Sequence, residues 1–444
     1  MRRLAFPFAT VRRGVPPPRT PLDEKEARAA MNAAVLLQCV GMLMMLMFTN
    51  GVLLLYFSAL DLSVEKVVFY LSLPRLLQAV ATVPGAWYCT SHGKKRIGHL
   101  GRMLMGIGGG CLVAGGFVGD WRREACIALG VTLCGVGEAM FASGWFALLD
   151  GIVPPAMRGR FFGRLRFSWQ LVGFAVTAVC SLWLTDRSPL VVFYGILAVG
   201  IFGVFASGTL YSLRIPEIEE EEPGREGPMA TLLRVLRAPG YLPFCAYVFL
   251  VTTFTATLPA IFGLLERNAL GMGDRTVVWL GNFGMLGCVL GFYLGGLAVD
   301  RWGTKVVFLA AHFGYALTLV LFLLRGLVPV ATPVWLGALH ALFGLVFASS
   351  SVAISAEMLA LAPPGNKPLA TSVCWSLFQG GTAICGMLGA GLLKSGMLRD
   401  SWRFGGLDLS AYDGILLIAA ALVALLTVTL GLVPSVIGRA ESAP

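Results

Sequence analysis

The ten residues at 296–305 read Gly-Leu-Ala-Val-Asp-Arg-Trp-Gly-Thr-Lys and lie between two long apolar segments. A turn this short between two membrane-length segments needs glycines where the backbone bends tightly. It also brings Asp300, Arg301 and Lys305 together at the edge of the apolar region. A degraded copy of the pattern lies in the first half of the chain, around Gly93 and Lys94. This repetition predicts a membrane protein built from two related halves.

The composition requires a bilayer as the solvent. Of the 444 residues, 57% are hydrophobic and only 13% are charged, with a mean hydropathy of +0.78. Soluble domains are nearer a quarter charged, so this chain has too few polar residues to cover a surface in water. A spanning helix needs about 20 apolar residues, and the sequence offers twelve such runs in two sets of six. They lie at 34–57, 67–89, 99–119, 125–149, 166–185, 190–213, 241–265, 276–299, 305–325, 333–360, 369–393 and 413–437.

The segment between the sixth and seventh runs divides the chain. It holds the acidic run 219–222 and then a stretch at 229–237 in which Arg234 and Arg237 lie beside an apolar helical face. We expect a solvated linker followed by a helix lying on the membrane surface. The predicted organisation is a tail at 1–33, a bundle at 34–213, a linker at 214–240, a bundle at 241–438 and a tail at 439–444.

The net charge of +10 reflects topology better than a nucleic-acid partner. The 34 Lys and Arg residues are scattered between apolar runs and form no patch with interleaved aromatic residues. With a cytoplasmic N-terminus most of them fall in inner segments, as the positive-inside rule requires. We expect an integral, multi-pass protein of the cell's inner membrane with both termini cytoplasmic. The residues assigned to inner segments include Lys94, Lys95, Arg96, Arg102, Arg158, Arg160, Arg164 and Arg166.

Motifs for enzymatic chemistry are missing from the sequence. The ten cysteines lie mostly in apolar runs, no CxxC pair occurs, and there are four histidines. This usage is typical of buried apolar thiols, so we expect no disulfide framework, no metal and no cofactor. Gly-x-Ser-x-Gly is absent, and the glycines at 106–110 precede no Lys-Ser or Lys-Thr, which excludes a phosphate loop. Those glycines, like Gly287, Gly291 and Gly295, indicate close helix packing instead.

Two landmarks recur in the second half at nearly one spacing. Gly93-Lys94 corresponds to Gly303-Thr304, and Pro154-Pro155 to Pro363-Pro364, each pair following a corresponding run. With the 296–305 motif and the six-plus-six pattern, the chain resembles transporters of the major facilitator superfamily over 34–438. There the motif joins helices 2 and 3 and is repeated between helices 8 and 9. The resemblance implies an all-α fold of twelve transmembrane helices in two pseudo-symmetric six-helix bundles, with the substrate site between them.

The resemblance also assigns residues to gating. By analogy, Asp300 and Arg301 exchange contacts as the carrier rocks. In the first copy, Ala86, Thr90 and Ser91 stand where the motif has Gly, Asp and Arg, so its charge lock should be weaker or rebuilt from other residues. The rebuilt lock would join Asp150 to Arg158 or Arg160. The predicted gating residues are Gly93, Lys94, Asp150, Arg158, Arg160, Gly296, Asp300, Arg301, Gly303, Lys305 and Glu357.

Two charged residues lie deep within apolar runs, Arg75 in the second and Glu138 in the fourth. A charge at mid-membrane costs several kcal/mol and usually faces a partner or a water-filled cavity. Two hypotheses therefore stand side by side. In one, Arg75 binds an anion and Glu138 takes up a proton; in the other, the two pair with each other or with loop charges and hold the bundle together.

Helices 1, 4, 7 and 10 line the cavity in the superfamily, which adds further candidates. For its Ser and Thr residues the competing interpretation is a bond back to a helix carbonyl, and for His340 a satisfied buried histidine. The predicted substrate or ion site comprises Arg75, Glu138, Asn50, Thr253, Thr257 and His340.

The leading hypothesis is a secondary transporter that works by alternating access. Its partners would be a small solute, protons and the lipid bilayer, and it would act as a monomer. Glu138 favours proton coupling and Arg75 an anionic solute. The alternative is a receptor or assembly factor on the same fold that binds without transport. A membrane enzyme is disfavoured by the missing motifs.

Overall fold

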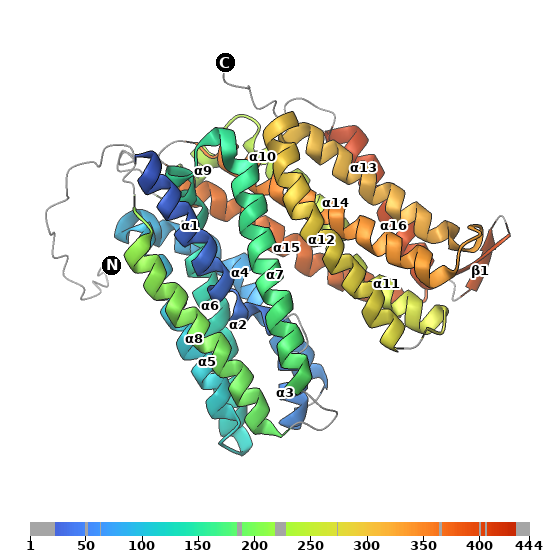
Figure 1. The fold of residues 1–444 in the computed structure, drawn as a ribbon, viewed down its shortest axis with the longest axis horizontal. Helices are drawn as coiled ribbons and strands as arrows, with labels where there is room; N and C mark the ends of the chain where they lie inside the picture. Colours follow the sequence, from blue (N-terminus) through green and yellow to red (C-terminus); the bar gives the residue numbers. More distant parts are fainter. Residues whose placement is uncertain are drawn as a thin grey trace, which may run out of the picture.

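The computed structural model describes residues 23–48, 52–62, 64–183, 189–217, 228–272, 274–363, 366–398, 401–404 and 406–431, and most of them lie in long helices (Figure 1). The first half consists of α1 (Glu24–Gly41), α2 (Leu43–Leu46), α3 (Val52–Ala59), α4 (Val64–His92), α5 (Lys94–Gly115), α6 (Asp120–Ile152), α7 (Arg158–Trp183) and α8 (Leu190–Arg214). The second half consists of α10 (Tyr241–Thr255), α11 (Leu258–Leu264), α12 (Asp274–Trp302), α13 (Thr304–Leu323), α14 (Thr332–Leu361), α15 (Lys367–Lys394) and α16 (Ala411–Leu426).

These helices make up the twelve expected membrane crossings. Ten segments in the described part of the chain are long and apolar enough to cross a membrane. The helices α4 and α7, with 29 and 26 residues, complete the set. At a rise of 1.5 Å per residue, each is longer than the hydrocarbon core of about 30 Å. The predicted all-α, twelve-helix membrane fold is confirmed.

The first crossing differs from its prediction. An unbroken helix was expected over 34–57, but α1 already begins at Glu24, and the chain is interrupted between α1, α2 and α3. The side chain of Asp23 caps α1 by accepting a hydrogen bond of 2.7 Å from the backbone N–H of Glu26. Hydropathy misses this start because the first turns carry charges, whereas a capping residue three positions before Glu26 is a helix signal in its own right.

Two smaller elements identify the ends of the molecule. Helix α9 (Pro228–Leu236) lies where the surface helix was expected, and an antiparallel hairpin of β1 (Ser401–Phe404) and β2 (Leu407–Ser410) precedes α16. The hairpin was not expected from the sequence. We call the end with α9 and the turns at Gly93 and Gly303 the linker end, and the opposite end, with α3 and the hairpin, the hairpin end (Figure 1).

The two bundles are joined at the linker end and diverge towards the hairpin end (Figure 1). The largest cluster of buried apolar side chains takes residues from both halves, including Phe146, Phe162, Tyr247 and Val352. Two further clusters lie towards the hairpin end, and each belongs to one half only. Across the junction, α4 packs on α15 and α7 packs on α12, as expected for two related halves.

Small residues let helices within a bundle approach closely, as the glycine spacing predicts. A Cβ at Gly287 of α12 would lie 1.9 Å from the carbonyl oxygen of Ala341 in α14. A Cβ at Gly108 of α5 would lie 2.7 Å from the carbonyl oxygen of Gly130 in α6. Neither site has room for a methyl group, so these glycines set the spacing of both helix pairs.

Candidate functional site

A cavity of about 180 Å³ lies where the two halves meet. Arg75 of α4 forms one side, and residues of α10, α13, α14 and α15 form the other. Several lining hydroxyls are already used, because Thr252 and Thr255 donate to carbonyls of their own helix. Arg75 is the charged residue in the lining. The polar lining residues are Arg75, Thr252, Thr255, Tyr315, Ser350, Ser351 and Thr382.

Arg75 is exposed in the structure, and in the described part of the chain no carboxylate or hydrogen-bond acceptor pairs with it. It directly follows Pro74, one of two prolines within α4. A proline inside a helix removes one backbone hydrogen bond and bends the helix. The guanidinium group of Arg75 therefore lies at an irregular point of α4 and lines the cavity between the halves.

A second cavity of about 120 Å³ lies on the first half's side of the junction. Its charged lining residues are Glu138 of α6 and Arg166 of α7. Arg166 donates hydrogen bonds to the hydroxyls of Ser351 and Ser355 in α14, so it crosses from one bundle to the other. Ser351 also lines the first cavity, and therefore the two cavities meet at this contact. No carboxylate of the described residues pairs with Arg166.

Aromatic rings form much of the wall between and around these cavities. Trp375 lines the second cavity and Phe378 the first, and their rings stack with centroids 5.2 Å apart and planes inclined by 6°. Among the described residues, the indole N–H of Trp375 is buried and meets no hydrogen-bond acceptor. Beside them, Gln379 of α15 donates to Gln78 of α4 at 2.8 Å, which is a polar contact between the halves.

Glu138 pairs with Arg102 and not with Arg75. Its carboxylate lies 3.2 Å from a guanidinium nitrogen of Arg102. Arg102 is fully buried in α5, with its guanidinium carbon 3.6 Å from the ring centre of Phe141. It also donates to the carbonyl of Gly41 and to the side chain of Gln38. Arg102 and Arg166 were both counted with inner segments, and the structure places them inside helices, in α5 and α7.

Three further binding candidates, Thr253, Thr257 and His340, line neither of these two cavities. Thr253 donates to the carbonyl oxygen of Phe249 at 2.8 Å, and the Thr257 hydroxyl is 3.0 Å from the Cys385 sulfur. His340 is buried and lies 2.6 Å from the carboxylate of Glu266. The structure thus gives it a polar partner, as the buried-histidine interpretation expects, and its role in binding stays a prediction. Asn50 lies outside the described residues.

At the linker end, Asp300 joins the halves through main-chain atoms. Its carboxylate, at the end of α12, accepts from the backbone N–H groups of Gly159 and Arg160 at 2.7 and 2.9 Å. The Arg160 side chain donates a further bond at 2.8 Å. These N–H groups lie in the first turn of α7 and have no partner within that helix. Gly296 packs against Gly159, since a Cβ on Gly296 would lie 2.7 Å from its carbonyl oxygen.

The first half carries a different lock, built from side chains. Asp150 at the end of α6 forms ion pairs with Arg158 of the same half and with Lys367 of the other half. The expected contact between Asp150 and Arg158 is present, whereas Arg160 bonds to Asp300 instead. Lys367 was not anticipated.

The other predicted gating residues lie near the starts and ends of helices. Gly93 and Gly303 start α5 and α13 with φ of 90° and 81°, values that favour glycine. The Lys94 N–H donates to Glu217 at 2.6 Å, and Glu357 accepts from Thr304 at 2.5 Å. Arg301 is exposed and lies over the Trp302 ring, and Lys305 is half-buried.

Two buried polar contacts in the second half had no counterpart in the sequence predictions. Glu266 pairs with His340, and Arg325 makes a bidentate pair with Asp413 at 2.5 and 2.9 Å. The partners are far apart in the chain, so their pairing could not be predicted. The sequence shows only that these polar residues lie in or beside apolar runs. In the described part of the chain no three His, Cys, Asp or Glu side chains gather as metal ligands would.

Two helical bundles that enclose charged cavities at their junction define a membrane transporter fold. The chain belongs to the Major Facilitator Superfamily, whose family model matches residues 34–385. A search of curated proteins finds no match.

Solved structures of transporters share the fold at low sequence identity. A bacterial homologue of the iron transporter ferroportin, in its outward-facing state, is 12% identical with a TM-score of 0.69, covering 91% of this chain and 98% of that one. The E. coli fucose:proton symporter is also 12% identical with a TM-score of 0.69, covering 90% and 97%. The human organic anion transporter MFSD10 is 14% identical with a TM-score of 0.66, covering 92% and 100%.

Proposed function

We propose that this protein is a secondary transporter that moves a small anionic solute by alternating access. The observation that carries the proposal is the pair of arginines at the junction, Arg75 and Arg166, neither of which meets a carboxylate among the described residues. The charge of Glu138 is already balanced by Arg102. The cavities therefore hold an excess of positive charge that a bound anion would neutralise.

Electrostatics and size both favour this class of solute. An anion that leaves water for the cavity loses its hydration, which a counter-charge and hydrogen bonds must replace, and Arg75 and Arg166 would supply both. A void of about 150 Å³ accommodates benzene, so the first cavity, at about 180 Å³, suits a carboxylate of similar size. The exposed face of the Trp375 and Phe378 stack favours a solute with an apolar part.

Alternating access follows from which contacts join the halves. Asp300, Asp150 and the largest apolar cluster hold the linker end closed, while the clusters at the hairpin end stay separate. With both termini in the cytoplasm of an inner-membrane protein, this arrangement faces the cavities outward. We further propose that the protein works as a monomer, since each bundle completes the site of the other.

Glu138 is our candidate for a coupled proton. It is a carboxylate in the wall of a cavity, and protonation would release Arg102 from its ion pair. Solute accumulation driven by a pH gradient should then be lost in Glu138→Gln, while solute exchange without a gradient persists in the folded fraction. Equal accumulation by both proteins would contradict this coupling.

The test begins with a search for the solute. The purified protein is screened by thermal unfolding at two pH values against carboxylates, phosphates, sugars and cations, because a ligand of the folded state raises its apparent stability. A stabilising anion is then followed into proteoliposomes carrying the wild type, Arg75→Gln or Arg166→Gln. Charge-assisted hydrogen bonds contribute about 1.5–3 kcal/mol, so each variant should bind roughly tenfold to a hundredfold more weakly.

Arg96→Gln is the matched control, because Arg96 is an exposed arginine near the start of α5, away from both cavities. It should bind and transport as the wild type does. Stabilisation by neutral or cationic compounds alone, or equal behaviour of Arg75→Gln and Arg96→Gln, would refute the anion proposal. Saturable binding without flux would favour the receptor alternative.

A further inference from the structure

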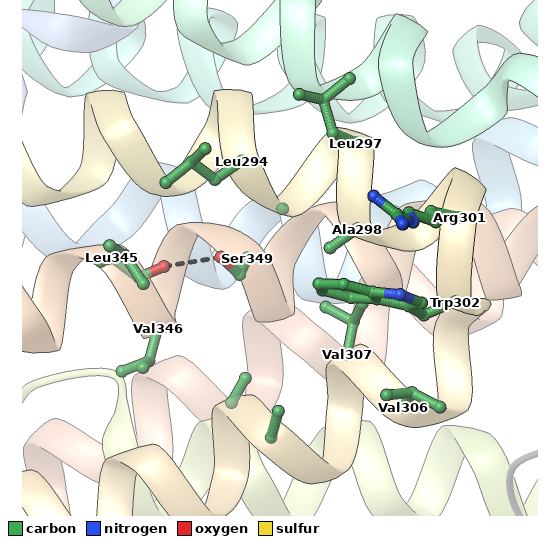
Figure 2. Close-up of a pocket in the computed structure, with 13 residues that line it drawn as sticks. Leu294, Leu297, Ala298, Arg301, Trp302, Val306, Val307, Leu345, Val346 and Ser349 are labelled. Carbon is green, nitrogen blue, oxygen red and sulfur yellow. Dashed lines mark hydrogen bonds between the residues drawn. The ribbon is translucent and has the colours of Figure 1, made fainter.

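A groove of about 560 Å³ runs along the outside of the second half between α12 and α13 (Figure 2). Its floor is α14, on which both helices pack. The walls are apolar: Leu294 and Ala298 come from α12, and Val306 and Ala310 from α13. This groove is separate from the two central cavities and shares no lining residue with them.

The groove opens to the surface that meets the bilayer. Leu294, Leu297 and Val306 are 48%, 42% and 50% exposed, and Ala310 is also exposed. Large exposed apolar patches on a soluble protein mark interaction sites, and on a membrane-spanning helix the natural partner is lipid. From Arg301 to Leu294 the groove follows α12 for roughly 10 Å at 1.5 Å per residue. It thus covers about a third of a hydrocarbon core some 30 Å thick.

One end of the groove is polar and basic. Figure 2 shows Arg301 and Trp302 together at this end, with Leu294, Leu345 and Val346 at the other. The guanidinium of Arg301 lies 5.8 Å from the Trp302 ring centre, and no carboxylate in the described ranges pairs with it. Its neighbour Asp300 is occupied by α7. Arginine and tryptophan are residues that reside at the headgroup level of a membrane.

We propose that this groove binds an anionic phospholipid, with an acyl chain between α12 and α13 and the phosphate on Arg301. The charge decides between lipids, because basic pockets between transmembrane helices bind anionic headgroups. A zwitterionic lipid such as phosphatidylcholine also carries a phosphate, but its own ammonium group offsets that charge, so its net attraction to Arg301 is weaker. The first half lacks this site, since Ser91 stands where the motif repeat would have the arginine.

The experiment is native mass spectrometry of the full chain in a neutral detergent, titrated with palmitoyl-oleoyl phosphatidylglycerol or phosphatidylcholine. The wild type should bind phosphatidylglycerol more tightly. Arg301→Gln should weaken that binding about fivefold, as expected for one basic residue near a headgroup, and should weaken phosphatidylcholine binding less. Ala310→Trp should weaken both lipids, because the indole enters the groove from an exposed position of α13.

Two controls make the outcome decisive. Arg96→Gln removes an exposed arginine near the start of α5 in the first half, away from the groove, and should leave both affinities unchanged. Soluble glycerol 3-phosphate should not bind, since it lacks the acyl chain. Equal binding of the two lipids to the wild type, or equal effects of Arg301→Gln and Arg96→Gln, would overturn the proposal. Binding of glycerol phosphate as tight as that of the lipid would do so as well, because it would identify a free-anion site.

Discussion

Asp300→Ala should open the linker end, and the structure allows the effect to be estimated. The carboxylate accepts two backbone hydrogen bonds, from Gly159 and Arg160, and one from the Arg160 side chain. Each charge-assisted bond to a backbone N–H is worth about 1.5–3 kcal/mol. The Arg160 side chain is 58% exposed, so its ion pair adds roughly 0–1 kcal/mol. After desolvation of the carboxylate, which is 10% exposed, the closed state loses roughly 3 kcal/mol, or about a hundredfold in population.

Hydrogen–deuterium exchange with mass spectrometry measures directly whether this contact is formed. The N–H groups of Gly159 and Arg160 lie in the first turn of α7, where a helix offers them no partner. Their protection therefore depends on Asp300. Losing a bond of about 2 kcal/mol should speed their exchange roughly 30-fold in Asp300→Ala.

Glu217→Ala is the matched control. Glu217 caps α5 in the same way, accepting from the N–H groups of Lys94 and Lys95 at 2.6 and 3.3 Å, but within one half. It should speed exchange at 94–95 and leave 159–160 unchanged. If Asp300→Ala leaves exchange at 159–160 as in the wild type, or if Glu217→Ala raises it equally, the cap does not hold the halves together.

Three further substitutions test the packing and the charges. Glu138→Gln leaves Arg102 buried without its carboxylate and should lower the free energy of unfolding by about 3–5 kcal/mol. The double variant Glu138→Leu with Arg102→Leu should have a melting temperature closer to that of the wild type. A double variant that melts as low as Glu138→Gln would contradict the ion-pair argument. Gly287→Ala should strongly destabilise the protein, because the new Cβ would overlap the Ala341 carbonyl. A Cβ at Gly281 meets nothing within 4 Å, so Gly281→Ala should raise the free energy of unfolding by up to about 1 kcal/mol. The melting temperatures of the two variants test this difference. Lys367→Asp should slow transport by placing like charges at the lock, and adding Asp150→Lys should restore part of the rate; no recovery would show that the pair is dispensable.

Much of the fold could be predicted because its signals are local. Apolar run lengths gave twelve crossings, and the glycine spacing in α12 predicted its tight contact with α14. The turns at Gly93 and Gly303 need positive φ, which a glycine before a helix reveals. The interruptions of the first crossing escaped notice, since hydropathy counts apolar residues and is insensitive to breaks in backbone hydrogen bonding.

The site was less accessible because it depends on which way helices face. The apolar run of the fifth crossing was placed at 166, but α7 begins at Arg158, which moves Arg166 roughly 12 Å into the helix at 1.5 Å per residue. A hydropathy profile places the start of a span after the last charged residue. An arginine that lies within a helix and faces a polar interior is therefore assigned to the segment before the span. Glu138 and Arg102 lie in different helices, and pairing them needs the relative rotation of α5 and α6. The roles of the predicted site residues remain predictions.

The Asp300 contact has an evolutionary consequence. Its two main donors are peptide N–H groups, which every residue except proline provides, so position 160 is free to drift at the loss of one exposed ion pair. Positions 159 and 296 are confined to glycine, because a Cβ at Gly159 would lie 2.5 Å from the Asp300 carboxylate and one at Gly296 would lie 2.7 Å from the Gly159 carbonyl. The first half's lock instead needs charged side chains at all three of its positions, Asp150, Arg158 and Lys367. Mutational tolerance at the linker end is therefore unequal: one lock depends on a single charged residue and two glycines, and the other on three charged residues.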